Sequence, residues 1–209
     1  MSERATGPIG STTPGHFGAD AAGVALGEVT IDAAWNVQGD PARAAFVASA
    51  QQLFAVPLPL VPNTTKRGSG LLVLWLGPRS WLLIESSPAR QSAALTDFAV
   101  RRDALNAQGG ALFDVSASRV AYAIRGPLAA TVLAKSCPLD FHPDVFPVGG
   151  CAQSLFGRVN ALIYRQDAAP TFVMLVARSL ARDTWRLLCR SSAQYGYEVA
   201  APRPRAEAR

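Results

Sequence analysis

The fold is decided by residues 114–165, which read DVSASRVAYAIRGPLAATVLAKSCPLDFHPDVFPVGGCAQSLFGRVNALIYR. Bulky and small apolar side chains alternate over 119–125, and this period of two predicts a β-strand. Gly126-Pro127 ends the strand, and Pro127 suits the first turn of a helix because that turn leaves N–H groups without an intrahelical partner. Leu128, Val132 and Leu133 supply an apolar helix stripe that ends at Cys137-Pro138. A proline-rich loop follows, and from Cys151 the chain is predicted to return as a hairpin.

Apolar periodicity predicts further elements on both sides of this stretch. The helices are expected at 41–54, with Asp40 as N-cap, at 88–105 and at 180–193. The strands are expected at 24–31, 71–76, 81–85, 111–116, 119–125, 151–156, 159–164, 172–176 and 197–199. Residues 56–70 contain three prolines and are expected to form an irregular loop. Both arms of the hairpin at 71–85 are almost wholly apolar, so both faces of its sheet should be covered.

A weak internal repeat indicates the fold class. The segments LWLGPRSWLLIESSPARQSAALTDF and IYRQDAAPTFVMLVARSLARDTWRLL share the order strand, turn, strand, helix. Two such units predict an α+β protein with ferredoxin-like βαβ halves and mixed or antiparallel sheets. The chain of 209 residues is expected to form one domain over 23–199, with 23–125 and 126–199 as candidate subdomains. Residues 1–22 are predicted to be a mobile arm and 200–209 a disordered tail.

Composition narrows the class of protein. Charged residues make up 17% of the chain, against about 25% in a typical soluble domain. Either part of the surface is covered by a partner, or a bias toward Ala and Arg lowers the number of Lys and Glu residues. The net charge of +5 is not gathered into a basic stripe with interleaved aromatics, so nucleic acid is not an expected partner.

Apolar runs, the first residues and the cysteines bear on the cellular compartment. The longest strongly apolar run, 71–76, is far shorter than the ~18 residues that a membrane span needs. The first residues lack the apolar core of a secretory signal. Three widely spaced cysteines fit a reducing compartment better than a disulfide framework. A cytoplasmic protein without a membrane partner is the prediction.

Candidate chemistry is concentrated in the proline-rich loop. Cys137, His142 and Cys151, with Asp140 and Asp144 between them, are residue types that bind zinc. Their C-x4-H-x8-C spacing lacks the closely spaced ligand pairs of known zinc motifs, so buried structural cysteines are favoured. A cysteine nucleophile would need a base and an orienting group, and only the Cys137–His142 combination is available in this loop. The alternative, which we favour, is that His142 bonds a backbone group of the loop.

Two glycine-containing turns do not have the setting of an anion site. Gly68-Ser69-Gly70 and Gly149-Gly150 each precede a predicted strand, whereas phosphate capture needs glycines between a strand and a helix. No dinucleotide or phosphate site is therefore predicted.

Two further features have both a structural and a functional interpretation. Asp114 is expected to brace the turn at 116–118, because Asp side chains accept hydrogen bonds from nearby backbone. Arg182, Arg186 and Arg190 recur at i, i+4 and i+8 on the last predicted helix. Such a stripe is usually a solvated face, and the functional alternative is a docking surface for an acidic patch on a partner.

Several segments together resemble a known family. DVSASRV, RGP, LAKSCPLDFHP, FPVGGCAQ and LIYR, with the earlier LWLGPRSWLLIE, are similar to the gamma subunit of heterotetrameric sarcosine oxidase. The resemblance covers about 23–199, and CPLDFHP…FPVGGCAQ is its most specific part. It implies an aminomethyltransferase-like fold.

The resemblance also implies a function. The expectation is a non-catalytic gamma subunit that supports assembly of an enzyme converting sarcosine to glycine, hydrogen peroxide and a one-carbon unit on tetrahydrofolate. FAD, FMN, NAD and tetrahydrofolate are expected in partner subunits, among alpha, beta and delta subunits of which alpha is the expected direct contact. No catalytic, cofactor-binding or metal-binding residue is expected in this chain.

Two alternatives remain open at this point. One is the equivalent subunit of another N-methyl amino acid dehydrogenase. The other is a freestanding folate-binding aminomethyltransferase-like protein, which would use Asp114 with Asp140 or Asp144. A nucleic-acid-binding module would rest only on the Arg content and pI.

Overall fold

The structure is a computed structural model that describes residues 13–85 and 97–200. Within these ranges the chain forms two compact units. Unit 1 contains residues 13–29, 118–148 and 153–200, and unit 2 contains 30–85, 97–117 and 149–152. The chain thus leaves unit 1 after residue 29 and re-enters it at 118, so this grouping does not follow the division at 125/126 that the sequence suggested.

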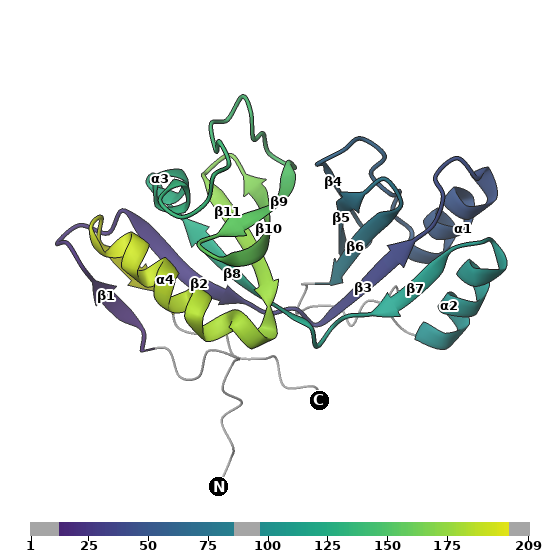
Figure 1. The fold of residues 1–209 in the computed structure, drawn as a ribbon, viewed down its shortest axis with the longest axis horizontal. Coiled ribbons are helices and arrows are strands. Elements are labelled where there is room, and N and C mark those ends of the chain that lie inside the picture. The colour runs from purple at the N-terminus through teal and green to yellow at the C-terminus, as the bar shows by residue number, and fades with distance from the viewer. Residues whose placement is uncertain (1–12, 86–96, 201–209) are drawn as a thin grey trace, which may run out of the picture. The chain divides into compact units, whose positions relative to one another are not determined.

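Unit 1 is built on a mixed sheet whose neighbours are mostly distant in sequence (Figure 1). In spatial order its strands are β1 (Gly15–Phe17), β12 (Tyr197–Val199), β2 (Val24–Val29), β8 (Arg119–Arg125), β11 (Thr171–Ala177), β10 (Val159–Asp167) and β9 (Cys151–Phe156). The pairing of β12 with β2 is parallel, whereas β1–β12, β2–β8, β8–β11 and β10–β11 are antiparallel. In β8 the five residues 120–124 are all buried, so both faces of this central strand are covered.

Two helices pack on the same face of this sheet. The helices α3 (Ala129–Ala134) and α4 (Ala181–Ala193) contact each other and both contact β11. A short 3₁₀ turn, η2 (Arg178–Leu180), leads into α4. The Tyr122 hydroxyl, from β8, donates to the Ala181 carbonyl at 2.9 Å and so fixes the start of α4 on the sheet.

Unit 2 has an antiparallel sheet covered on one face by two helices (Figure 1). Its spatial order is β4 (Thr65–Gly68), β5 (Leu71–Gly77), β6 (Ser80–Glu85), β3 (Ala33–Gln38) and β7 (Ala111–Asp114), and the helices are α1 (Ala44–Phe54) and α2 (Phe98–Ala107). Phe46 and Phe54 from α1 pack with Trp81 and Leu105 in the core. The chain passes close to Phe46 at Gly39, where a Cβ atom would lie 2.3 Å from Phe46 Cε2.

The structure confirms the predicted α+β class with mixed and antiparallel sheets. It also confirms the hairpin with two covered faces. Leu71 and Val73 of β5 join the core under the helices, and Leu72 and Leu74, which alternate with them, are buried as well. The strands β8, β9 and β12 have the predicted bounds.

Some local predictions were wrong. The helix predicted at 41–54 begins only at Ala44, because Asp40 instead accepts the Ala42 and Arg43 N–H groups and forms a turn. The loop predicted at 56–70 contains the edge strand β4, and β3 was not predicted. The predicted edge strand 197–199 is flanked by β1, which lies inside the segment expected to be an arm. Residues 88–96 of the helix predicted at 88–105 lie outside the described residues.

Candidate functional site

The proline-rich loop between α3 and β9 is held down by aromatic packing and by a buried cation. The rings of Phe141, Phe146 and Phe172 pack together, with centroids 5.3–6.1 Å apart. Arg165, which is only 8% exposed, donates from Nη1 to the Phe146 carbonyl at 3.2 Å and from Nε to the Asp167 carbonyl at 3.3 Å. Its guanidinium carbon lies 6.0 Å from the Phe172 ring centroid. The loop therefore has a defined conformation without secondary structure.

The candidate metal or nucleophile residues of this loop have different environments. Cys137 and Cys151 are buried, and burial raises the pKa of the Cys151 thiol to about 11. The His142 side chain is 63% exposed, its Nδ1 lies 3.6 Å from an Asp144 carboxylate oxygen, and it accepts the Asp144 N–H at 3.4 Å. The predicted bond from His142 to loop backbone is confirmed. Among residues 13–85 and 97–200, no cluster of three or more His, Cys, Asp and Glu side chains could hold a metal ion.

Asp114 ends β7 and braces the turn that follows. Its Oδ1 accepts the Ser116 N–H at 2.9 Å and the Ser116 hydroxyl at 2.6 Å. The Ser116 Oγ in turn accepts the Ala34 N–H at 3.0 Å, which ties the turn to β3. The predicted bracing role is confirmed, and it uses the Oδ1 oxygen of the Asp114 carboxylate.

The glycine turns are structural. Gly68-Ser69-Gly70 joins β4 to β5, two antiparallel strands, and therefore lies at no helix N-terminus. Gly149 accepts the Thr65 N–H at 2.8 Å, and Gly150 forms a β-bridge with Thr64. Both glycine pairs thus complete the sheet edge of unit 2.

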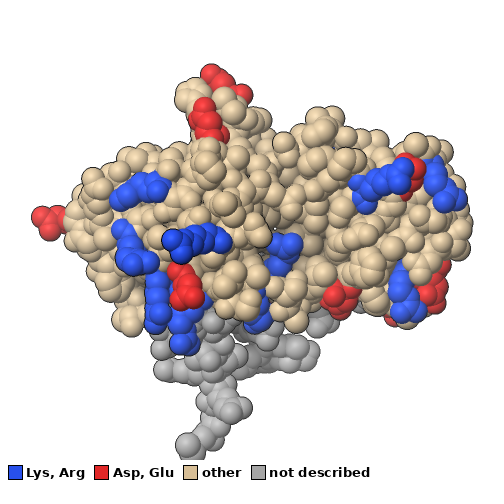
Figure 2. Space-filling view, in the orientation of Figure 1, with Lys and Arg blue, Asp and Glu red and all other residues tan. Residues whose placement is uncertain are grey.

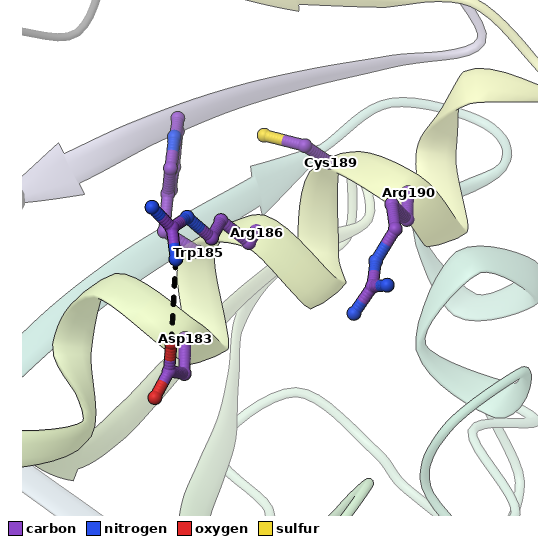
Figure 3. Close-up of a pocket in the computed structure, with 5 residues that line it drawn as sticks. All are labelled: Asp183, Trp185, Arg186, Cys189 and Arg190. Atoms are coloured by element: carbon purple, nitrogen blue, oxygen red, sulfur yellow. Dashed lines mark ion pairs between the residues drawn. The ribbon is translucent and has the colours of Figure 1, made fainter.

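An open pocket of about 630 Å³ lies beside α4 and is lined by Asp183, Trp185, Arg186, Cys189 and Arg190 (Figure 3). Figure 3 shows Trp185 and Cys189 projecting from the same side of α4. The Trp185 ring packs on Tyr122, with centroids 5.4 Å apart, yet remains partly exposed. Burial raises the pKa of the Cys189 thiol, and its hydrogen bond with Tyr197 lowers that pKa in part. The pocket thus has an apolar floor.

The rim of this pocket is basic. The only ion pair that its residues form within the described part of the chain joins Arg186 to Asp183, at 3.7 Å. Figure 2 shows Lys and Arg side chains gathered over the part of unit 1 where α4 lies. The predicted arginine stripe is exposed at all three positions. Leu188 of the same helix is fully buried, whereas Trp185 and Cys189 are only partly buried and line the pocket.

Large uncharged areas surround these features. Figure 2 shows broad tan surface on each unit between scattered charged groups. Several large apolar side chains lie in solvent: Leu60 at 55%, Val61 at 65%, Val100 at 69%, Val145 at 63% and Phe113 at 49% exposure. Leu60 and Val61 are displayed by a fixed segment, because the preceding Pro59 carbonyl accepts the buried Trp81 indole N–H at 2.7 Å. None of the described helices is long and apolar enough to cross a membrane.

Comparison with known proteins identifies close relatives. Residues 38–194 match the model of the family described as sarcosine oxidase, gamma subunit. The chain is 35% identical over 124 residues to sarcosine oxidase subunit gamma of Corynebacterium sp. strain U-96, covering 59% of this chain and 51% of that protein. It is 31% identical over 157 residues to sarcosine oxidase subunit gamma of an Arthrobacter species, covering 75% and 74%. The chain thus spans about half the length of the first relative and about three quarters of the second.

Solved structures give the same picture. A chain of the heterotetrameric sarcosine oxidase from Corynebacterium sp. U-96, in complex with pyrrole 2-carboxylate, aligns with a TM-score of 0.74 and 28% identity, covering 86% of this chain and 88% of that one. Aminomethyltransferase T of the glycine cleavage system from Bartonella henselae aligns with a TM-score of 0.57 and 18% identity, covering 86% of this chain and 48% of that one. At that identity the second match shows the fold alone, and it confirms the expected aminomethyltransferase-like fold.

Proposed function

The chain belongs to the sarcosine oxidase, gamma subunit family, and we propose that it is the non-catalytic gamma subunit of a heterotetrameric sarcosine oxidase. The observation that carries this proposal is the structural match over 88% of a chain from such an enzyme, at 28% identity. The assembly would oxidise sarcosine to glycine, with formation of hydrogen peroxide and transfer of the one-carbon unit to tetrahydrofolate. The chain would supply interface area that holds the assembly together.

The geometry of this chain supports a role without an active site. Asp114, the carboxylate considered for folate, is engaged by Ser116. Gly68-Ser69-Gly70 lies between two strands and Gly149-Gly150 directly precedes β9, so neither glycine turn lies at a helix N-terminus that could bind a phosphate. The residues considered for a phosphate or a pterin thus have structural roles, which supports a chain that holds no cofactor itself. We propose that FAD, FMN, NAD and tetrahydrofolate are held by partner subunits of the assembly.

The surface supports a role in assembly. A partner that covers exposed apolar side chains would stabilise the assembly, because burying apolar area is favourable by about 25 cal/mol per Å². Such side chains are Leu60, Val61, Val100 and Val145. Leu60 and Val61 follow a carbonyl fixed by Trp81, so little conformational entropy would be lost when a partner covers them. The three free cysteines fit assembly in a reducing compartment, and we place the complex in the cytoplasm.

Co-purification tests the proposal. The chain would be tagged and expressed in its native host, and the eluate examined for associated subunits, flavin absorbance and peroxide release on addition of sarcosine. We expect a yellow complex with sarcosine-dependent peroxide formation, which is lost when the gene of this chain is deleted and restored by its re-expression. Recovery of a colourless chain without partners would overturn the proposal.

The substrate needs its own comparison, because the equivalent subunit of another N-methyl amino acid dehydrogenase would also co-purify with flavin. The purified complex would be assayed with sarcosine and with N-methylglutamate at equal concentrations. A higher kcat/KM for sarcosine supports the proposal, and a higher value for N-methylglutamate assigns the chain to the other enzyme.

A further inference from the structure

The pocket beside α4 combines an apolar surface with a basic one. Its floor is formed by Trp185 and Cys189, which point to the same side of the helix (Figure 3). The exposed residues Arg186 and Arg190 also line the pocket. Trp and Arg are the residues most enriched among those that dominate binding energy at protein interfaces.

The charges on α4 are not balanced within the described residues. The helix carries Arg182, Asp183, Arg186 and Arg190, and the single carboxylate pairs with Arg186 at 3.7 Å. Arginines four residues apart on one helix face repel each other by a few tenths of a kcal/mol. A ligand that brings carboxylates would relieve this repulsion, and it would be recognised by the fork of N–H donors that each guanidinium presents.

The floor requires an apolar group from the same ligand. One face of the Trp185 ring is used by Tyr122, at 5.4 Å between centroids, and the ring remains partly exposed to the pocket. A pocket of about 630 Å³ is large enough for an apolar side chain with its flanking backbone. Nucleic acid does not match this site, because a single strand needs a basic groove with several aromatic rings for stacking. Here the arginines lie on one helix, and Trp185 is the aromatic residue that lines the pocket.

We propose that the pocket beside α4 docks an acidic segment of a partner subunit, whose apolar side chain packs on Trp185 while its carboxylates bind Arg186 and Arg190. This inference rests on the proposed function, because it names one contact of the chain within the assembly. The proposed occupant is a partner subunit with an acidic surface, because Arg186 and Arg190 complement negative charge.

A thiol footprint tests whether the pocket is covered. Cys189 lines the pocket, whereas Cys137 and Cys151 are buried and serve as internal references. The isolated full chain and the purified complex would be treated with N-ethylmaleimide, and alkylation of each cysteine followed by mass spectrometry. We expect Cys189 to react at least about tenfold more slowly in the complex, with both references unchanged. Equal rates at Cys189 in the two samples would overturn the proposal.

A charge variant tests the rim. The complex would be prepared with Arg186→Gln and Arg190→Gln together, and with the control Arg79→Gln and Arg102→Gln, which removes two exposed arginines of unit 2. The fraction of chain that remains in the complex would be measured by gel filtration at increasing NaCl. We expect the first variant to dissociate at lower salt and the control to behave like the wild type, because interfacial charge pairs weaken as salt rises. Equal salt resistance of both variants would overturn the proposal.

The outcomes separate this inference from the proposed function. If the wild-type chain enters no complex, the proposed function fails. If it enters a complex and neither the footprint nor the α4 variant responds, only the docking site fails. If the isolated chain self-associates and Arg186→Gln with Arg190→Gln abolishes this, the occupant is a second copy of the chain, which also overturns a partner subunit as occupant.

Discussion

Replacing Arg165 by Met removes a buried guanidinium while keeping a side chain of similar length. Arg165 donates to the carbonyls of Phe146 and Asp167 at 3.2 and 3.3 Å. A hydrogen bond from a charged donor contributes about 1.5–3 kcal/mol, and both distances are long, so we take the lower value for each. Part of this loss is offset, because burying Met does not require the removal of water from a charged group. We expect Arg165→Met to lower the free energy of unfolding by about 2–3 kcal/mol.

The assay measures both global stability and the loop. A loss of this size corresponds to a fall in Tm of roughly 4–12 °C for a chain of this length. Urea unfolding followed by tryptophan fluorescence gives the free energy, and hydrogen exchange reports where the structure loosens. Exchange should accelerate at 141–148 and around Asp167 and remain unchanged in α1, because the lost bonds hold the Phe146 and Asp167 carbonyls and neither bond involves α1.

A matched control and a clear contrary result complete the test. Arg158 lies exposed at the hairpin turn between β9 and β10, so Arg158→Met should change stability by less than about 0.5 kcal/mol. If Arg165→Met were as stable as the wild type, the hydration cost of the buried cation would equal its hydrogen bonds. The view that Arg165 holds the loop down would then be refuted.

Three further predictions follow from single contacts. Asp114→Ala should cost about 1–2 kcal/mol in urea unfolding, because the Ser116 N–H loses its acceptor and the Ser116 hydroxyl keeps only its longer bond to the Ala34 carbonyl, at 3.3 Å. Asp114→Asn should cost less than half as much, and equal costs would contradict the acceptor role. Gly196→Ala should lower Tm markedly, since φ is +65° and a Cβ atom would lie 2.2 Å from the Ala21 carbonyl oxygen, and an unchanged Tm would refute this. Because burial raises the Cys151 pKa to about 11, the unfolded state loses its thiol proton first above about pH 9 and stability falls from pH 9 to 11. Urea unfolding at pH 8 and 10 should show a smaller fall for Cys151→Ala, and an unreduced fall would count against this assignment.

The sequence predicted best where side-chain alternation was strong. β8 was placed at its observed bounds because bulky and small apolar residues alternate through it. β3 escaped prediction because Asn36 interrupts its apolar pattern; in the structure the Asn36 amide donates to Ser80 Oγ and to the Trp81 carbonyl across the strand pair. β4 has the residues TKRG, with no apolar side chain, as edge strands often do. Such strands are specified by their neighbours rather than by their own residues.

The candidate site was predicted in part for a similar reason. Helical spacing alone placed Arg182, Arg186 and Arg190 on one stripe. The apolar floor beside them was missed, because the exposure of Trp185 depends on where Tyr122 meets α4. A tryptophan next to an arginine stripe, four residues from a cysteine, was the available signal. It could not separate a core position from a pocket without the packing of the sheet.

Besides a covered surface and a bias toward Ala and Arg, the low charge content of the chain has a third explanation in the structure. Central strands such as β5 and β8 are buried on both faces, so they need apolar residues at consecutive positions and leave little room for charge. A bulk deficit of charge is therefore expected even for a chain without partners. A covered surface is instead indicated by particular side chains, such as Leu60 and Val61, which are apolar, exposed and held in fixed positions. Interface mapping should therefore begin at those residues and at α4, because composition alone would point equally to every face.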